Sequence, residues 1–198
     1  MSRVLFLLVV AVALACANGR QQGGSGIVTT SGRIGLLQLD HSTRKSVVAS
    51  ADRPDVETLG KAGSGGRYDA LGYDCDSRPG RDRLPLRGES SRGGPYCRTA
   101  YYIDRKTGLL ETFFTTASRF SQSDGVRVGM AAATAERLLH KRRRVGCATD
   151  IYLYAANATM AVAFVGGKVQ PSHYVVGGRV FGFVPHSKRR DAGIFDCL

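Results

Sequence analysis

The sequence has no tryptophan, and it has only one long apolar run, from Val4 to Ala15. Tryptophan is an anchor residue favoured at tight protein interfaces, so contacts of that kind are excluded. No later stretch approaches the roughly 20 apolar residues that a helix needs to cross a membrane. We therefore expect the mature chain to have no membrane-spanning helix.

The apolar run has the features of a secretory signal peptide, which we assign to residues 1–17. Arg3 supplies the positive start, and the run is too short to span a bilayer and ends in small residues. We therefore expect the protein to be secreted or extracytoplasmic. Two ends of the signal fit the residues: ordinary cleavage near Ala15 or Ala17, or lipoprotein-type processing that leaves Cys16 lipidated and the protein attached to the cell envelope.

The motifs that carry most recognisable chemistry are also absent. The four histidines show no zinc-protease spacing, and the cysteines lie too far apart for a zinc pair motif. Residues 63–66 are Gly-rich but lack the Lys and Ser/Thr of a phosphate-binding loop. His186 and Ser187 are adjacent in sequence, which does not point their side chains at each other. We expect no metal, no cofactor and no catalytic residue.

The cysteines beyond the signal form an even set of four. Cysteines in an oxidising compartment usually pair, and four of them allow three connectivities. We favour Cys75 with Cys97 and Cys147 with Cys197, because each predicted half of the chain then has its own disulfide. Cys16 is the odd cysteine, which fits either removal with the signal or lipidation.

The chain is strongly basic, with 28 Lys and Arg against 16 Asp and Glu. Such a balance favours association with an anionic envelope component, nucleic acid or an acidic protein, although genome composition also explains a high arginine content. Two clusters stand out: Lys141, Arg142, Arg143 and Arg144, and Lys188, Arg189 and Arg190. The first cluster is either a solvated helix end or, with the second, an anion-binding patch. No aromatic residues are interleaved, so we expect no specific nucleic-acid binding.

The pattern of turns and apolar residues predicts a tether over residues 18–26 and two tandem units, 27–120 and 121–198. In the second unit, a glycine turn leads into apolar residues at Ala131, Ala135, Leu138 and Leu139, which is helical spacing. In the first unit, Ser42 or Thr43 caps a similar short helix, which Pro54 closes. The match needs a one-residue shift, with Asp40-His41 in place of Gly129-Met130.

Strand patterns follow each predicted helix. The clearest is a hairpin of residues 97–104 and 109–116, with Gly108 where the turn needs positive φ. Other candidate strands are 68–73, 151–155, 159–165 and 179–184. Residues 60–67 are interpreted as a Gly-rich linker, and residues 76–95 as a long exposed loop whose ends the first disulfide would join.

Aromatic residues alternate along these strands. The candidates for an open sheet face are Tyr102, Phe113, Tyr152, Tyr154, Phe181 and Phe183. Successive side chains of a strand face opposite sides, so one set is expected in the core and the other could contact a partner. Core packing on both faces is the alternative, because the chain has few large apolar residues.

Residues 124–130, followed by Glu136 and Leu138-Leu139, resemble a phrase found in the β-lactamase-inhibitor-protein-like fold and in small outer-membrane assembly lipoproteins of related fold. The resemblance implies an α+β protein of two tandem units, each a short helix packed on an antiparallel sheet. It also implies an open, often concave sheet face that docks onto a partner protein. No inhibitory loop can be matched residue by residue, so inhibition is not carried over.

We therefore predict an exported, non-enzymatic binding protein, with a lipid at Cys16 as one of its two processing outcomes. It would contact a protein or an anionic envelope component through the open sheet face and the basic edge. An exported hydrolase using His173, His186 and Asp191 is the alternative from another class. Non-specific polyanion binding is the third.

Overall fold

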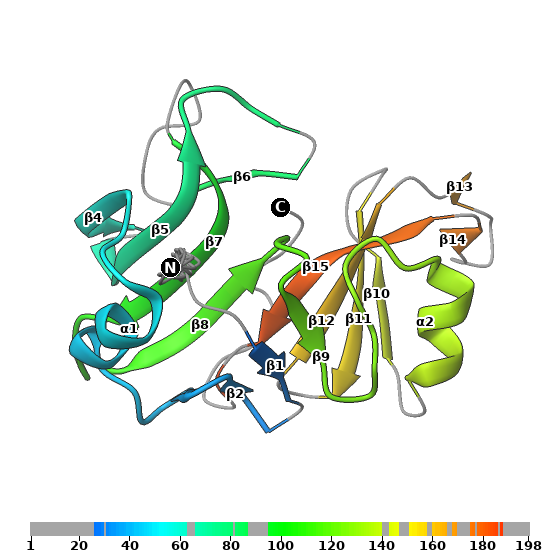
Figure 1. The fold of residues 1–198 in the computed structure, drawn as a ribbon, viewed down its shortest axis with the longest axis horizontal. Coiled ribbons are helices and arrows are strands. Elements are labelled where there is room, and N and C mark those ends of the chain that lie inside the picture. The colour runs from blue at the N-terminus through cyan, green and yellow to red at the C-terminus, as the bar shows by residue number, and fades with distance from the viewer. Residues whose placement is uncertain are drawn as a thin grey trace, which may run out of the picture.

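A computed structural model describes residues 26–29, 31–62, 66–80, 82–86, 95–139, 143–146, 151–157, 160–165, 168–169, 175–176, 178–185 and 187. The structure consists mostly of strands, with two helices, which confirms the predicted α+β class (Figure 1). The predicted signal peptide, the tether before Gly26 and the chain after Ser187 lie outside these residues.

The main element is a nine-stranded sheet. In spatial order its strands are β10 (Arg143–Gly146), β11 (Ile151–Asn157), β12 (Met160–Val165), β15 (Arg179–Pro185), β8 (Leu110–Thr115), β7 (Tyr96–Asp104), β5 (Tyr68–Asp76) and β4 (Val56–Ala62), and β6 (Leu84–Pro85) pairs with β7. The order contains two antiparallel meanders, β4–β5–β7–β8 and β10–β11–β12–β15. Their last strands join them, with Phe183 opposite Thr115.

A smaller sheet has the order β3 (Leu37–Gln38), β2 (Arg33–Ile34), β1 (Gly26–Val28) and β9 (Phe120–Gln122). β1 and β9 pair in parallel, and β13 (Lys168–Val169) and β14 (Val175–Val176) form a separate pair. Strands from both sides of the predicted boundary at residue 120 therefore share both larger sheets. The tandem repetition of whole units stays a prediction.

The predicted central hairpin is confirmed by β7 and β8, and Gly108 has a φ of 71°. Two predictions nearby were wrong. β4 extends to Ala62, into the stretch interpreted as a linker, and residues 76–95 are not wholly exposed. Leu84 and Leu86 are only 8% and 1% exposed, because β6 carries them onto the sheet beside β7.

The first helix, α1 (Arg44–Ala51), begins as predicted at Thr43. The Thr43 hydroxyl accepts from the Ser46 N–H, and the Ser46 hydroxyl accepts from the Thr43 N–H, which is a reciprocal capping box. Val47 and Ala51 are buried one turn apart, so one face of the helix packs on the sheet.

The second helix, α2 (Ala132–Leu138), also forms where the spacing predicts it. Gly129, with a φ of 84°, makes the turn before it. Ala132, Ala135 and Leu139 are buried, but Ala131 is exposed because it stands at the cap position. The Ala131 side chain makes no cap hydrogen bond, so α2 begins without a capping box like that of α1.

Two clusters of buried residues cover the sheet on opposite faces. In β5, Leu71 and Tyr73 belong to the cluster under the helices, whereas Tyr68 and Ala70 belong to the other. Alternate residues of a strand face opposite sides, so both faces of this part of the sheet are packed.

Candidate functional site

Two aliphatic side chains in and beside the small sheet are exposed to solvent. Leu36 is 92% exposed at the β2–β3 turn, and Ile27 is 55% exposed in β1. They are neighbours, because the Gly35 N–H donates to the Ile27 carbonyl at 3.0 Å. Val28, next along β1, is fully buried, so Ile27 faces away from the core.

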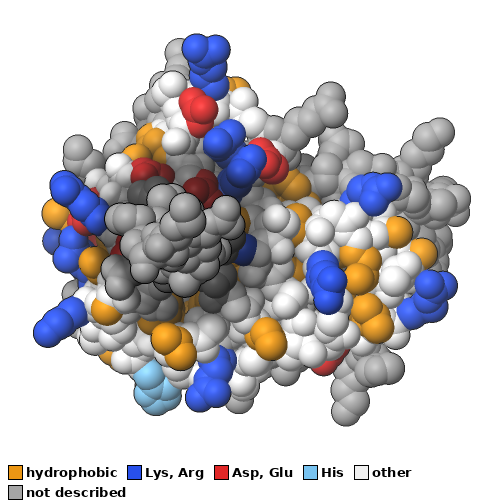
Figure 2. All heavy atoms as spheres, in the orientation of Figure 1, with side chains coloured by type: hydrophobic (Ala, Val, Ile, Leu, Met, Phe, Trp, Pro, Cys, Tyr) orange, Lys and Arg blue, Asp and Glu red, His pale blue; other side chains and the backbone are white. Residues whose placement is uncertain are grey.

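Two exposed arginines share this side of the small sheet. Arg33 is exposed in β2, next to the buried Ile34, and Arg127 bridges to Ser121, the partner of Ile27 in β9. We call Ile27, Arg33, Leu36 and Arg127 the outer hairpin face. Figure 2 shows hydrophobic and basic side chains along the lower edge of the molecule, where Figure 1 places β1 and β2.

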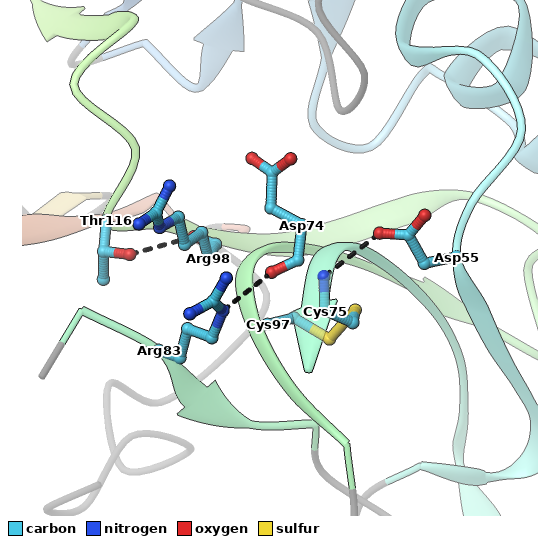
Figure 3. The surroundings of a disulfide bond; sticks show 7 residues. All are labelled: Asp55, Asp74, Cys75, Arg83, Cys97, Arg98 and Thr116. Carbon is cyan, nitrogen blue, oxygen red and sulfur yellow. Dashed lines mark hydrogen bonds between the residues drawn. A yellow bond between two sulfur atoms is a disulfide. The ribbon is translucent and has the colours of Figure 1, made fainter. Parts of the chain in front are cut away.

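The disulfide between Cys75 and Cys97 confirms one of the predicted pairs (Figure 3). The two cysteines are register partners in β5 and β7. A Cβ atom on Gly72 would lie 2.7 Å from the Cys97 Sγ, so the sulfurs need a glycine there. Cys147 and Cys197 lie outside the described residues, and the lipidation site Cys16 does too.

Arginine and aspartate side chains surround the disulfide. The Arg119 Nη1 donates to the Asp74 Oδ2 at 2.6 Å, and the Arg83 Nε donates to the Asp74 carbonyl at 3.2 Å. The Arg98 Nη2 lies 2.6 Å from the Asp82 Oδ2. Arg119 and Arg98 are thus paired with carboxylates, whereas Arg83 bonds a backbone carbonyl, and these contacts tie the segments around the disulfide together.

A second charged cluster lies where β7 turns into β8. The Arg67 Nε donates to the Asp104 Oδ2 at 2.8 Å, and its Nη2 donates to the Glu111 Oε1 at 2.9 Å. The Asp104 and Glu111 side chains are only 6% and 7% exposed. We call these three residues the Arg67 clamp. The sequence pattern did not single them out, because Arg67 is 37 and 44 residues from its partners.

The charge of Asp104 is stabilised where it lies. Burial raises its pKa, but the hydrogen bond from Arg67 and the N–H groups of Thr107 and Lys106 outweigh burial and lower the pKa to about 2. The carboxylate therefore stays ionised at neutral pH with its oxygens occupied. It supports the hairpin and has no proton to exchange at that pH.

Ser187 is also held structurally. Its hydroxyl donates to the Asp40 carboxylate at 2.7 Å, and its N–H donates to the Glu111 carbonyl at 2.8 Å. The side chain is buried and engages an aspartate directly, so no histidine stands between the two as in a serine nucleophile site. The residues of the hydrolase alternative, His173, His186 and Asp191, lie outside the described residues.

The predicted aromatic face needs correction for three residues. Tyr102 is 2% exposed, and Phe113 and Phe183 are fully buried, so none of them contacts solvent or a partner. Each packs in a core cluster, which was the alternative considered for them. Phe181 is only partly buried, beside the second cluster. Tyr152 and Tyr154 lie in β11, where only the backbone is described.

The two basic clusters are only partly described. Arg143 and Arg144 lie in β10, the last strand of the large sheet at that end, opposite Ala155 and Tyr154. Lys141 and Arg142 precede it outside the described residues, as do Lys188, Arg189 and Arg190 after β15. The part of the chain that the structure describes contains no group of three or more potential metal ligands and no helix long and apolar enough to cross a membrane.

Comparison with known proteins adds a fold relationship. No protein-family model and no curated protein matches the chain. A similar solved structure is the crystal structure of the uncharacterized protein YfeY from Escherichia coli, with a TM-score of 0.53 and 12% sequence identity. The match covers 81% of this chain and 99% of that one. At this identity it relates the folds alone.

Proposed function

We propose that the protein is an exported, non-enzymatic binding protein, lipid-anchored through Cys16, that contacts a protein or an anionic envelope component. We also propose that the chain is built of two tandem units, as in the β-lactamase-inhibitor-protein-like group. The Cys75–Cys97 disulfide supports the location, because disulfides persist in oxidising compartments outside the cytoplasm. The signal-like N-terminus supports export.

The binding surface that we propose is the basic edge of the large sheet. The observation that carries it is the position of β10, the end strand of the described sheet, which contains Arg143 and Arg144. Two consecutive residues of this end strand are therefore basic. Charge on a sheet edge also prevents unwanted pairing with other strands, which leaves the edge available for an anionic ligand.

The test compares two pairs of basic residues for binding to a purified anionic cell-wall polysaccharide. Replacing Arg143 and Arg144 with Gln is expected to weaken binding about fivefold or more at low salt, because two cations leave the proposed surface. Replacing Arg105 and Lys106, exposed at the β7–β8 turn, removes the same charge elsewhere and should change binding less than about twofold.

Equal losses in the two variants would mean that the polysaccharide responds to net charge alone, which is the polyanion alternative. If neither variant changes the affinity, the basic edge is not the binding surface. Both variants change exposed or edge positions, so an unchanged melting temperature is the control for folding.

A further inference from the structure

The outer hairpin face contains two of the three large hydrophobic side chains that the described residues expose. Leu36 and Ile27 lie together there, whereas the third, Leu59, lies alone on β4 and is 62% exposed. Single exposed apolar residues are ordinary on protein surfaces. These two belong to neighbouring backbone positions, because Gly35, which precedes Leu36, donates its N–H to the Ile27 carbonyl.

Charge on this face has one sign. Arg33 and Arg127 are the charged members, and the outward partners Gln38 and Ser121 are neutral. No carboxylate belongs to the described strands β1, β2, β3 and β9. Asp124 is exposed at the turn between β9 and Arg127, so the two arginines are the charged residues of the strands and bridge rather than of the whole edge. Aliphatic side chains flanked by arginines match the chemistry of an anionic phospholipid surface, where apolar groups enter the interface and cations meet head groups.

The position of this face along the chain gives an independent argument. β1 begins at Gly26, and nine residues separate it from Cys16. Nine residues span at most about 30–35 Å when fully extended. These nine residues include Arg20 and no acidic residue. A lipid on Cys16 would therefore hold the start of β1 within about 30–35 Å of the bilayer.

We propose that the outer hairpin face rests on the anionic phospholipid bilayer that holds the anchor. Ile27 and Leu36 enter the interface, and Arg33 and Arg127 contact the head groups. This inference depends on the proposed lipid anchor for its location. Figure 1 places β1 and β2 at the lower edge and β6 at the upper edge, so the contact would direct the disulfide end away from the bilayer.

The experiment uses the full chain with Cys16→Ser, exported and checked by intact mass to carry no lipid. The probes are vesicles of phosphatidylglycerol and phosphatidylethanolamine, and vesicles of phosphatidylcholine alone, with binding measured by sedimentation. We expect binding to the anionic vesicles and at least tenfold weaker partitioning of the Ile27→Glu/Leu36→Glu variant. The single variant Leu36→Glu should also partition more weakly, and Leu59→Glu is its matched control, because each places one negative charge at an exposed leucine. The partitioning of Leu59→Glu should stay within about twofold of the parent.

The proposal is overturned if the unlipidated protein ignores the anionic vesicles, if the double variant partitions like its parent, or if Leu59→Glu loses as much. Unchanged melting temperatures exclude unfolding as the cause of a loss. Arg143→Gln/Arg144→Gln should partition normally here, which separates this face from the basic edge. If the native protein carries no lipid on Cys16 but vesicle binding still depends on Ile27 and Leu36, the proposed lipid anchor is wrong and the proposed membrane contact of the outer hairpin face is supported.

Discussion

The two helices begin in the same way at the backbone and differently at the side chain. Before α1, the Asp40 N–H donates to the Leu110 carbonyl at 2.8 Å, and the Leu110 N–H donates to the Ser42 carbonyl at 2.7 Å. Leu110 is the first residue of β8, so the helix start is fixed to the final strand of the first meander. Thr43 and Ser46 then close the capping box.

Before α2, the Gly129 N–H donates to the Val180 carbonyl, and the Val180 N–H donates to the Met130 carbonyl, both at 2.8 Å. Val180 lies at the start of β15, the final strand of the second meander. No side-chain cap follows, but the Ala132 N–H donates to the Gly178 carbonyl. Docking on the sheet thus satisfies a first-turn donor of α2, whereas a side-chain cap satisfies one in α1.

Hydrogen bonds to a strand therefore position each helix, and a side-chain cap adds stability where those bonds leave first-turn N–H groups without a partner. The first turn contains one residue more than the second, which explains the one-residue shift in the sequence match. Both turns also need a left-handed residue at the docking N–H: Asp40 has a φ of 63° and Gly129 of 84°.

The largest expected effect tests whether the first meander depends on its disulfide. Replacing Cys75 and Cys97 with Ala should lower the free energy of unfolding by about 3 kcal/mol, because the cross-link closes a loop with a sequence separation of 22. Urea unfolding measures this change. Amide exchange should quicken in β5 and β7 and change little where α2 docks on β15. Equal acceleration at both places would show that the two halves open as one unit.

The next effect concerns the Arg67 clamp, which also belongs to the first meander. The folded pKa of Asp104, about 2, lies below the usual value for an aspartate. Its ionisation therefore stabilises the fold above about pH 4, by about 2 kcal/mol, and this contribution is lost as the pH falls from about 4 to 2. Urea unfolding across this pH range should show the loss.

Arg67→Met is the control for the clamp. This substitution should lower the free energy of unfolding by about 2 kcal/mol at pH 7, because two buried carboxylates lose their charged donor. It should also reduce the loss of stability at acid pH. Arg105→Met removes a more exposed arginine, 3.7 Å from Asp69, and should cost less than about 0.5 kcal/mol. Persistence of the full acid loss in Arg67→Met would assign the titration to another group.

The smallest effects are expected from removing the side-chain cap of α1 and from adding one to α2. Thr43→Ala should lower the free energy of unfolding by about 1 kcal/mol, because the capping box is lost. Ala131→Ser should raise it by about 0.5 kcal/mol, because Ala131 already has the extended backbone of a cap and lacks only the acceptor. Urea unfolding of both variants checks the opposite signs. If Ala131→Ser instead lowers the free energy of unfolding, the contact with β15 already satisfies the N–H groups that the serine hydroxyl was expected to accept from.

Local features were predictable because their causes lie within a few residues. The Thr43 cap, the Gly108 turn and the Gly129 turn each depend on one backbone conformation and its neighbours. β4 was missed because its Gly and Lys residues have weak strand preference, and pairing with β5 decides its structure. The burial of Tyr102 and Phe113 on opposite faces was not predictable, since it depends on what covers each face.

The two candidate surfaces also differ in whether the sequence could predict them. The basic edge could be proposed from sequence because Arg143 and Arg144 are consecutive, although only the strand order places them at the end of a sheet. The outer hairpin face could not, because Arg127 joins the β1–β2 hairpin only through β9, which is far from that hairpin in sequence.

The amino-acid sequence was enough to predict the α+β class, both helix positions and the central hairpin, because periodicity, caps and turns act through local chemistry. It left three cysteine pairings open, and the structure shows the Cys75–Cys97 pair. Only the packing of the folded chain shows that the two meanders join through β8 and β15, that Arg67 pairs with two buried carboxylates, and which aliphatic side chains remain exposed. The physical reason is that burial and ion pairing depend on neighbours brought together across the chain, and no local pattern records those neighbours.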